Sequence, residues 1–245
     1  NVTGDVHSDV QHDQHAVLVL RTGKVTINNS DNHEFTVTGP AGEGGRCYYN
    51  GFFSDAKPET TINGGIYKGS EANKETLFNY SGILRLNNVT STSEGGLALN
   101  NWATTYINGG QYDGGQPTIR NRQSYSHIEL DGDVKVNVDQ WNALLNQGTA
   151  IIRNGTYTGN AYPTIGLLKG SKTFVYGGTF KNINTEQLGK VFSNAGELTI
   201  DGADVQIENV GGTACAVGNT GTLTFNNGTV TAPKGAAILN TSSTT

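Results

Sequence analysis

The fold is decided by a short stretch that recurs along the chain, and its clearest copy is Ile152-Arg153-Asn154-Gly155-Thr156-Tyr157. In each copy an apolar residue, which we call the anchor, is followed by one polar residue and then by Gly or Asn. The anchors are Ile27, Ile62, Leu86, Ile107, Leu130, Ile152, Val175, Ile200 and Phe225. They lie 21 to 25 residues apart, except for one interval of 35 residues after Ile27. Such a period is typical of stacked units, or rungs, that bury their apolar faces against one another.

Two further columns follow each anchor at fixed distances. The residue two positions later is always Gly or Asn, which tolerate positive φ, so we expect a left-handed turn in every rung. This turn column consists of Asn29, Gly64, Asn88, Gly109, Gly132, Asn154, Gly177, Gly202 and Asn227. Five positions after the anchor we expect a second inward column, because strand side chains alternate. That column consists of Tyr67, Tyr112, Tyr157, Phe180, Val205 and Val230.

A polar column precedes each anchor by six or seven residues. Apolar residues stand two positions before these polar residues, and strand side chains alternate between two faces. The polar side chains are therefore expected to point inward, at a turn. Stacked there, asparagine side chains can bond from rung to rung and satisfy turn backbone groups, so we expect an asparagine ladder. The predicted members are Asn79, Asn100, Gln123, Asn146, Asn194, Asn219 and Asn240. Asn50 is a further candidate, in the irregular rung near the start of the chain.

Each rung is thus expected to contain three short strands separated by an asparagine turn and a Gly/Asn turn. With this pattern the chain resembles the single-stranded right-handed parallel β-helix family, which includes pectate-lyase-like enzymes, tailspikes and bacterial surface adhesins. The run from Tyr176 to Phe180 is most similar in style to secreted or surface repeat proteins of bacteria. The resemblance covers about residues 16–245. It implies an all-β solenoid of about nine to ten rungs, but it does not specify an activity.

The single period predicts one solenoid domain. We expect residues 1–16 to form a polar cap and residues 17–245 to form the β-helix, with an insertion at about 38–58. The 34 glycines and only 5 prolines suit many tight turns. The sequence contains no Met and does not begin with the charged and apolar regions of a signal peptide, so we expect a processed chain or an excised fragment. Its last rung breaks off at Thr245. Because an open β-helix end exposes strand edges, we expect a C-terminally truncated chain that continues in the natural gene.

Composition excludes several classes of protein. The net charge is −5 and no basic stripe occurs, so we expect no nucleic-acid partner. No run of about 18 apolar residues is present, so we expect no transmembrane segment. Cys47 and Cys215 are separated by about seven rungs of about 4.8 Å each, too far for a disulfide. We therefore expect both cysteines to be free.

Two sets of apolar residues are candidate binding sites. The first lies on the insertion, where loop aromatics can stack on a sugar ring or pack against the solenoid, and the sequence favours packing. This set consists of Tyr48, Tyr49, Phe52 and Phe53. The second is an outward stripe that is interrupted by Glu129 and could be an interface or be covered by loops. This stripe consists of Tyr106, Ile151 and Phe174.

Few residues are candidates for chemistry. Asp131 and Arg153 follow anchors on neighbouring rungs, and Asp133 lies close by, which is the best arrangement for a polysaccharide-cleaving site. The alternative, which the sequence favours, is a surface ion pair beside a turn. His12 and His15 could bind a metal, but in an extended strand they point to opposite faces, so a polar cap is favoured. We expect no cofactor.

The sequence favours a non-catalytic extracellular structural or adhesion module, such as a surface stalk or fibre segment. One alternative is a polysaccharide-binding or polysaccharide-cleaving β-helix of tailspike-like or lyase-like type. A second alternative is a self-assembling filament or sheath subunit. The expected partners are a host or cell-surface glycan or protein, or copies of the chain itself. The expected location is extracellular or at a cell surface.

Overall fold

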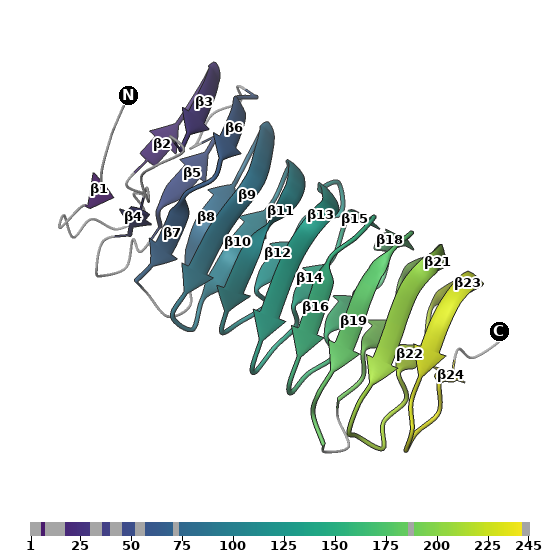
Figure 1. Ribbon diagram of the computed structural model, residues 1–245. Helices are drawn as coiled ribbons and strands as arrows, with labels where there is room; N and C mark the ends of the chain where they lie inside the picture. The colour runs from purple at the N-terminus through teal and green to yellow at the C-terminus, as the bar shows by residue number, and fades with distance from the viewer. Residues whose placement is uncertain are drawn as a thin grey trace.

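The computed structural model describes residues 6–7, 18–29, 36–39, 46–51, 57–70, 74–185 and 189–241. In these ranges the chain forms a parallel β-solenoid without helices, and successive strands lie side by side along one axis (Figure 1). The expected all-β parallel β-helix is therefore confirmed. The described part of the chain offers no helical segment able to cross a membrane.

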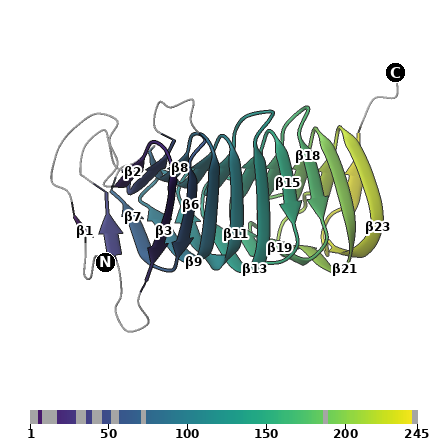
Figure 2. The ribbon, with the colours of Figure 1, turned by 90° about the horizontal axis from the view of Figure 1, so that it is seen from above.

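The described strands form two sheets, of fourteen and ten strands. The ten-stranded sheet contains, in spatial order, β2 (Leu18–Leu20), β5 (Tyr48–Asn50), β8 (Glu75–Asn79), β10 (Leu97–Asn101), β12 (Ile119–Asn121), β14 (Leu144–Asn146), β17 (Ile165–Leu167), β20 (Phe192–Asn194), β22 (Val217–Asn219) and β24 (Ile238–Asn240). The fourteen-stranded sheet contains, in chain order, β1 (Val6–His7), β3 (Lys24–Asn28), β4 (Thr36–Thr38), β6 (Glu59–Asn63), β7 (Ile66–Gly69), β9 (Ile83–Ser93), β11 (Thr104–Gly114), β13 (His127–Val138), β15 (Thr149–Ile152), β16 (Thr156–Gly159), β18 (Lys172–Val175), β19 (Gly178–Asn182), β21 (Glu197–Asn209) and β23 (Thr222–Thr231). Figure 2 shows successive rungs stacked side by side along the axis of the solenoid.

Each regular rung supplies one strand to the ten-stranded sheet and either one long strand or two short strands to the other sheet. Long strands such as β9 and β11 bend at the Gly/Asn position, so two of the three predicted strands merge there. In contrast, β15 and β16 remain separate. About seven rungs, from β8 to β23, stack regularly. The predicted nine to ten rungs also counted β2 to β7 and β24, so that number is too high for the regular part.

The anchors form the centre of the core. From Ile62 to Ile200 each anchor is at most 2% exposed, as strand alternation requires. Phe225 is the exception among the described anchors after Ile62, with 36% of its surface exposed. Burial of these large apolar side chains is the main favourable term in the stability of the column.

The second inward column is also buried, except for Val230, which is partly buried. Tyr157 and Phe180 stack with ring centroids 4.9 Å apart, and both are fully buried. The register places Ile207 rather than Val205 beside Phe180. The reason is an irregularity in β21, which shifts its pairing between Asp201 and Gln206. The prediction of an apolar column is thus right, with one member misassigned.

The left-handed turn occurs as predicted in four successive rungs, with φ of 73° at Gly64, 51° at Asn88, 71° at Gly109 and 70° at Gly132. In later rungs the positive φ moves one residue along the chain. It falls there on Gly155, Gly178 and Gly228. The predicted positions at Asn154, Gly177 and Asn227 are therefore wrong by one residue. The predictions at Asn29 and Gly202 are also wrong, because neither residue has a positive φ.

A ladder of asparagines, buried except for its last member Asn240, runs along the end of the ten-stranded sheet. In each step an Nδ2 group donates to the Oδ1 atom of the next asparagine. The steps are Asn50 to Asn79 (2.9 Å), Asn79 to Asn101 (3.0 Å), Asn101 to Asn121 (2.8 Å), Asn121 to Asn146 (2.8 Å), Asn194 to Asn219 (2.6 Å) and Asn219 to Asn240 (3.0 Å). Leu167 occupies the intervening position beside Asn146 and Asn194. The ladder therefore consists of two segments.

Two of the predicted ladder members are wrong. Asn100 faces outward, because the inward position at the end of β10 is filled by Asn101. Gln123 lies beyond the ladder, because Asn121 fills the position and residues 122–126 lengthen the connection to the next strand. The distance from the ladder to the anchor is thus not constant.

Both cysteines are free and buried, as expected. The Cys47 thiol donates to the carbonyl oxygens of Val37 and Lys68, each at 3.2 Å. Burial raises the pKa of this thiol to about 12, although backbone hydrogen bonds with Gly39 and Lys68 lower it. Cys47 is therefore a neutral core residue at physiological pH.

Tyr112 and Tyr157 provide a matched test of the core. Both are fully buried, but the Tyr157 hydroxyl donates to the Asn154 carbonyl at 3.1 Å, whereas the Tyr112 hydroxyl has no partner among the described residues. We expect Tyr112→Phe to stabilise the protein by about 1 kcal/mol and Tyr157→Phe to destabilise it by about 1 kcal/mol. Urea unfolding of the two variants measures both effects. Equal effects in the two variants would contradict this assignment.

Candidate ligand-binding site

Residues next to the ladder asparagines point away from the core. In β5 and β8 the outward residues Tyr49 and Phe78 directly precede a ladder asparagine, and the register places them side by side. Tyr80 and Trp102 directly follow a ladder asparagine, at the corner where the chain leaves this sheet. We call these four residues the aromatic cluster.

The aromatic cluster has a buried base and an accessible rim. The Tyr49 and Phe78 centroids are 4.7 Å apart, and each residue is 4% exposed. Trp102 meets Phe78 edge to face at 5.3 Å and lies 5.5 Å from Tyr80, and both rim residues are half-buried. Such tilted pairs are favourable beyond the area they bury. Burial raises the pKa of Tyr49 to about 12, although the positive charge of Arg46 lowers it.

An ion pair closes one side of the cluster. Arg46 Nη2 lies 2.7 Å from Glu75 Oε2, and Arg46 Nε donates to the same oxygen at 2.9 Å. The Arg46 guanidinium also lies 5.6 Å from the Tyr49 ring and 5.5 Å from the Phe78 ring. The other oxygen of Glu75 accepts a hydrogen bond from Asn100 at 2.9 Å. Both oxygens of this carboxylate therefore have partners within the protein.

Two more arginines flank the cluster on the next rung. The Arg122 guanidinium lies 4.8 Å from the Trp102 ring centroid, and its side chain is exposed. Arg120 is half-buried at the outward position of β12. Its Nη2 group makes a long contact of 3.4 Å to Gln147, and its Nε atom is buried without a partner among the described residues. Burial lowers the pKa of Arg120, Arg122 lowers it further, and Glu75 raises it.

Two pockets meet at the aromatic cluster. The first has a volume of about 310 Å³ and is lined by all four aromatic residues together with Arg46, Glu75 and Arg122. The second has a volume of about 730 Å³, and its lining includes Lys57, Glu59, Gln123 and Tyr125. Tyr80 and Trp102 line both pockets, so their rings form the ridge between them.

A third pocket of about 560 Å³ lies at the connections that lead back to the ten-stranded sheet. Its lining includes Glu94, Asp113, Asp139 and Trp141. Trp141 stacks on Tyr162 with ring centroids 4.9 Å apart and an interplanar angle of 5°. This corner is acidic, whereas the aromatic cluster is flanked by arginines.

Comparison with known proteins gives no relative from which a function could be inferred. The chain matches no protein-family model, no curated protein and no solved structure.

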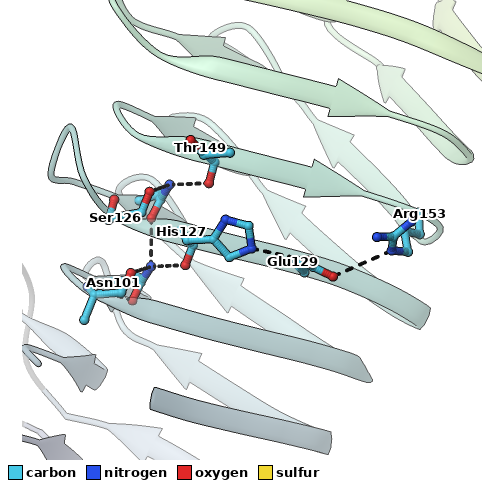
Figure 3. Close-up of polar contacts among 8 residues, drawn as sticks. Asn101, Ser126, His127, Glu129, Thr149 and Arg153 are labelled. Atoms are coloured by element: carbon cyan, nitrogen blue, oxygen red, sulfur yellow. Dashed lines mark hydrogen bonds and ion pairs between the residues drawn. The ribbon is translucent and has the colours of Figure 1, made fainter. Parts of the chain in front are cut away.

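Each of the predicted catalytic residues has a partner outside the predicted set. Arg153 Nε lies 3.6 Å from Glu129 Oε2, and His127 Nε2 lies 3.2 Å from Glu129 Oε1 (Figure 3). Asp131 instead accepts a hydrogen bond from the following backbone NH at 2.8 Å, and Asp133 lies 3.1 Å from Lys135. Arg153 therefore pairs with a carboxylate that the sequence did not single out as catalytic.

The predicted outward stripe lies in one register column. Tyr106, Glu129, Ile151 and Phe174 are successive neighbours in the fourteen-stranded sheet, and all four are half-buried. Arg85 lies over the Tyr106 ring at 4.8 Å. None of the three pockets described above is lined by the stripe. Its role as an interface stays a prediction.

The structure divides the predicted insertion site. Tyr48 points inward, where its hydroxyl lies 2.6 Å from Thr60 Oγ1, while Tyr49 joins the outer cluster. Phe52 and Phe53 lie outside the described residues, as do His12 and His15. Within the described ranges no group of three or more His, Cys, Asp or Glu residues is arranged to hold a metal.

Sequence reasoning missed most of the aromatic cluster. Phe78 lies in the five-residue strand β8, and Tyr80 and Trp102 lie at the corners that follow β8 and β10, where the repeat gives no column. The available signal was parity, because residues on either side of an inward ladder asparagine must face outward. That rule finds Phe78 and Tyr80 around Asn79, and Trp102 after the correct ladder residue Asn101.

Proposed function

We propose that this solenoid is a non-catalytic module that binds a polysaccharide at the aromatic cluster, as the adhesive part of an extracellular or cell-surface protein. The observation that carries the proposal is the ridge formed by Tyr80 and Trp102 between two pockets. A continuous site of this kind suits a chain-like ligand that crosses the ridge and enters both pockets.

The chemistry of the cluster supports a sugar ligand. A sugar ring has an apolar face of C–H groups that packs on an aromatic ring, and hydroxyl groups that bond to charged side chains around it. The half-buried rings of Tyr80 and Trp102 offer the first kind of contact. The charged groups of Arg122, Lys57 and Glu59 at the rims of the pockets offer the second.

The carboxylates of the site support binding without cleavage. A glycoside hydrolase needs a pair of carboxyl groups, one acting as an acid and the other as a base or nucleophile. Glu75 has both oxygens engaged by Arg46 and Asn100. Glu59, the other acidic residue that lines these two pockets, lies 3.0 Å from Lys24. Ion-paired carboxylates of this kind suit a structural role.

The rigidity of the scaffold also supports adhesion. A parallel solenoid with a buried ladder holds its outward side chains at fixed positions, so little order must be imposed when a ligand binds. The site lies on the flat outer side of the ten-stranded sheet and its corner, where a long polymer has access.

Trp102→Ala tests the proposal. We expect this change to weaken polysaccharide binding at least tenfold, by about 1.4 kcal/mol or more, because it removes one of the two rings shared by both pockets. Binding is measured by affinity electrophoresis and calorimetry over a panel of neutral and acidic polysaccharides. Release of new reducing or unsaturated ends is measured in the same samples.

Tyr176→Ala is the matched control, because Tyr176 is an exposed aromatic that lies near Arg153 on the other sheet. Its binding should equal that of the unchanged chain. Equal loss in both variants would contradict a site at the cluster, and product release by the unchanged chain would contradict a non-catalytic role. Concentration-dependent assembly in place of glycan binding would favour the filament alternative.

A further inference from the structure

Resting on the proposed function, we propose that the polysaccharide is anionic, and that Arg120 and Arg122 hold one of its carboxylate or sulfate groups beside the Trp102 ring. The ligand class follows from the charges around the aromatic cluster. It does not follow from the aromatic rings, which would accept neutral sugars equally well.

Positive charge around the cluster is not balanced by the carboxylates that line its pockets. Glu75 is engaged by Arg46, and Glu59 by Lys24. Arg120 and Arg122 have no ion pair among the described residues. The whole chain has a net charge of −5, so this excess is local and opposes the general charge of the molecule. Such a patch attracts an anion to one place.

Arg120 carries the strongest indication of a missing partner. Its Nε group is buried with no acceptor among the described residues, and its Nη2 group has only a long contact to Gln147. Buried charged donors are normally paired and hydrogen-bonded. An oxyanion bound at the accessible part of the half-buried Arg120 side chain would compensate this charge and offset the repulsion between Arg120 and Arg122.

Arg122 is held ready for such an anion. Its planar guanidinium lies over the Trp102 ring, which restricts its orientation while the side chain stays accessible. A guanidinium in this arrangement can donate two parallel hydrogen bonds to a carboxylate or sulfate. The sugar that bears the anion would then lie against the ridge of the two pockets.

The register limits the anionic contact to one place on the column. The outward residue beside Arg120 on the previous rung is Asn100, and on the next rung it is Leu145. Further along, Gly166 and Ser193 continue the uncharged column. The structure therefore predicts one anchored charge on this outward column, at β12.

The test compares matched ligands and matched variants. The ligands are hyaluronan, its carboxyl-reduced neutral form and chondroitin sulfate, and the variants are Arg120→Gln and Arg122→Gln. We expect each variant to bind both anionic polymers about tenfold more weakly and with a smaller dependence on salt. Binding of the neutral form should be unchanged. A loss confined to chondroitin sulfate would identify sulfate as the recognised group, and an equal loss for hyaluronan would identify carboxylate.

Arg153→Gln is the control for charge, because it removes one cation from the other sheet and should leave binding unchanged. Thermal unfolding controls for folding, and Arg120→Gln should not lower the melting temperature, because it removes an uncompensated half-buried charge. If Trp102→Ala abolishes binding while both arginine variants bind anionic polymers normally, the anionic inference is overturned and the proposed function stands. If none of the three changes matters, both are overturned.

Two other results would also overturn the inference. Equal affinity for single-stranded DNA would show a general preference for polyanions. Salt-sensitive dimerisation, abolished by Arg122→Gln, would show that the arginines bind the acidic third pocket of another copy, whose lining includes Glu94, Asp113 and Asp139.

Discussion

Replacing Asn121 by alanine is expected to lower the free energy of unfolding by about 3 to 5 kcal/mol. The Asn121 side chain is fully buried in the middle of the longer ladder segment. It accepts from Asn101 at 2.8 Å, and it donates to Asn146 Oδ1 at 2.8 Å and to the Thr149 carbonyl at 3.0 Å. Its truncation leaves buried polar groups on both neighbouring rungs without a partner, where water cannot replace it. Equilibrium urea unfolding measures the loss.

Asn63→Ala is the matched control. Asn63 belongs to a second asparagine stack, on the outer surface, where it donates to Asn28 and accepts from Asn87, each at 2.7 Å. Two hydrogen bonds between asparagine side chains are lost there, as at Asn121, but water can satisfy the partners. We expect a cost below about 1 kcal/mol. A similar cost at both positions would show that burial does not determine the strength of the ladder.

Replacing Gly110 by alanine is expected to cost about 4 kcal/mol or more. Gly110 lies just after the left-handed turn of β11 with φ of 102°. A Cβ atom added there would lie 2.2 Å from the Val89 carbonyl oxygen and 2.7 Å from the Val89 nitrogen. Both atoms belong to the backbone of the adjacent rung, so relief of the clash requires two rungs to separate. Urea unfolding and amide hydrogen exchange of the flanking rungs measure the effect.

Gly170→Ala separates the conformational cost from the clash. Gly170 also has positive φ, at 84°, but an added Cβ would have no atom within 4 Å. We expect a loss of only about 1 to 2 kcal/mol, the usual cost of a side chain in the left-handed region. If the two alanine variants unfolded at the same urea concentration, the close approach between rungs at Gly110 would not contribute to the loss of stability.

The asparagine ladder shows how far the sequence determines the fold. The 21- to 25-residue period and the Gly/Asn position were sufficient to predict a parallel β-helix, because each residue of these columns meets its counterpart on the next rung. The exact ladder residue was not predictable at β10 and β12. There the number of residues between ladder and anchor varies, and a shift of one residue turns the side chain to the other face.

The candidate site depended more heavily on tertiary structure. Arg46 and Arg122 meet the same aromatic cluster from different rungs, 76 positions apart in the sequence. No local pattern connects them, since their proximity results from the stacking of β5, β8, β10 and β12. In the same way, the ion-pair partner of Arg153 is Glu129 and not Asp131. The order of residues in the sequence does not show which of these two carboxylates the long Arg153 side chain contacts on the neighbouring rung.

The sequence by itself determined the repeat, the inward columns and the all-β solenoid, because these depend on alternation within a strand and on a period that every rung shares. The tertiary structure alone decided which side chains meet on the outer surface. Irregular corners and connections of variable length set the final register there, and they bring Tyr80, Trp102 and Arg122 together at the junction of two pockets.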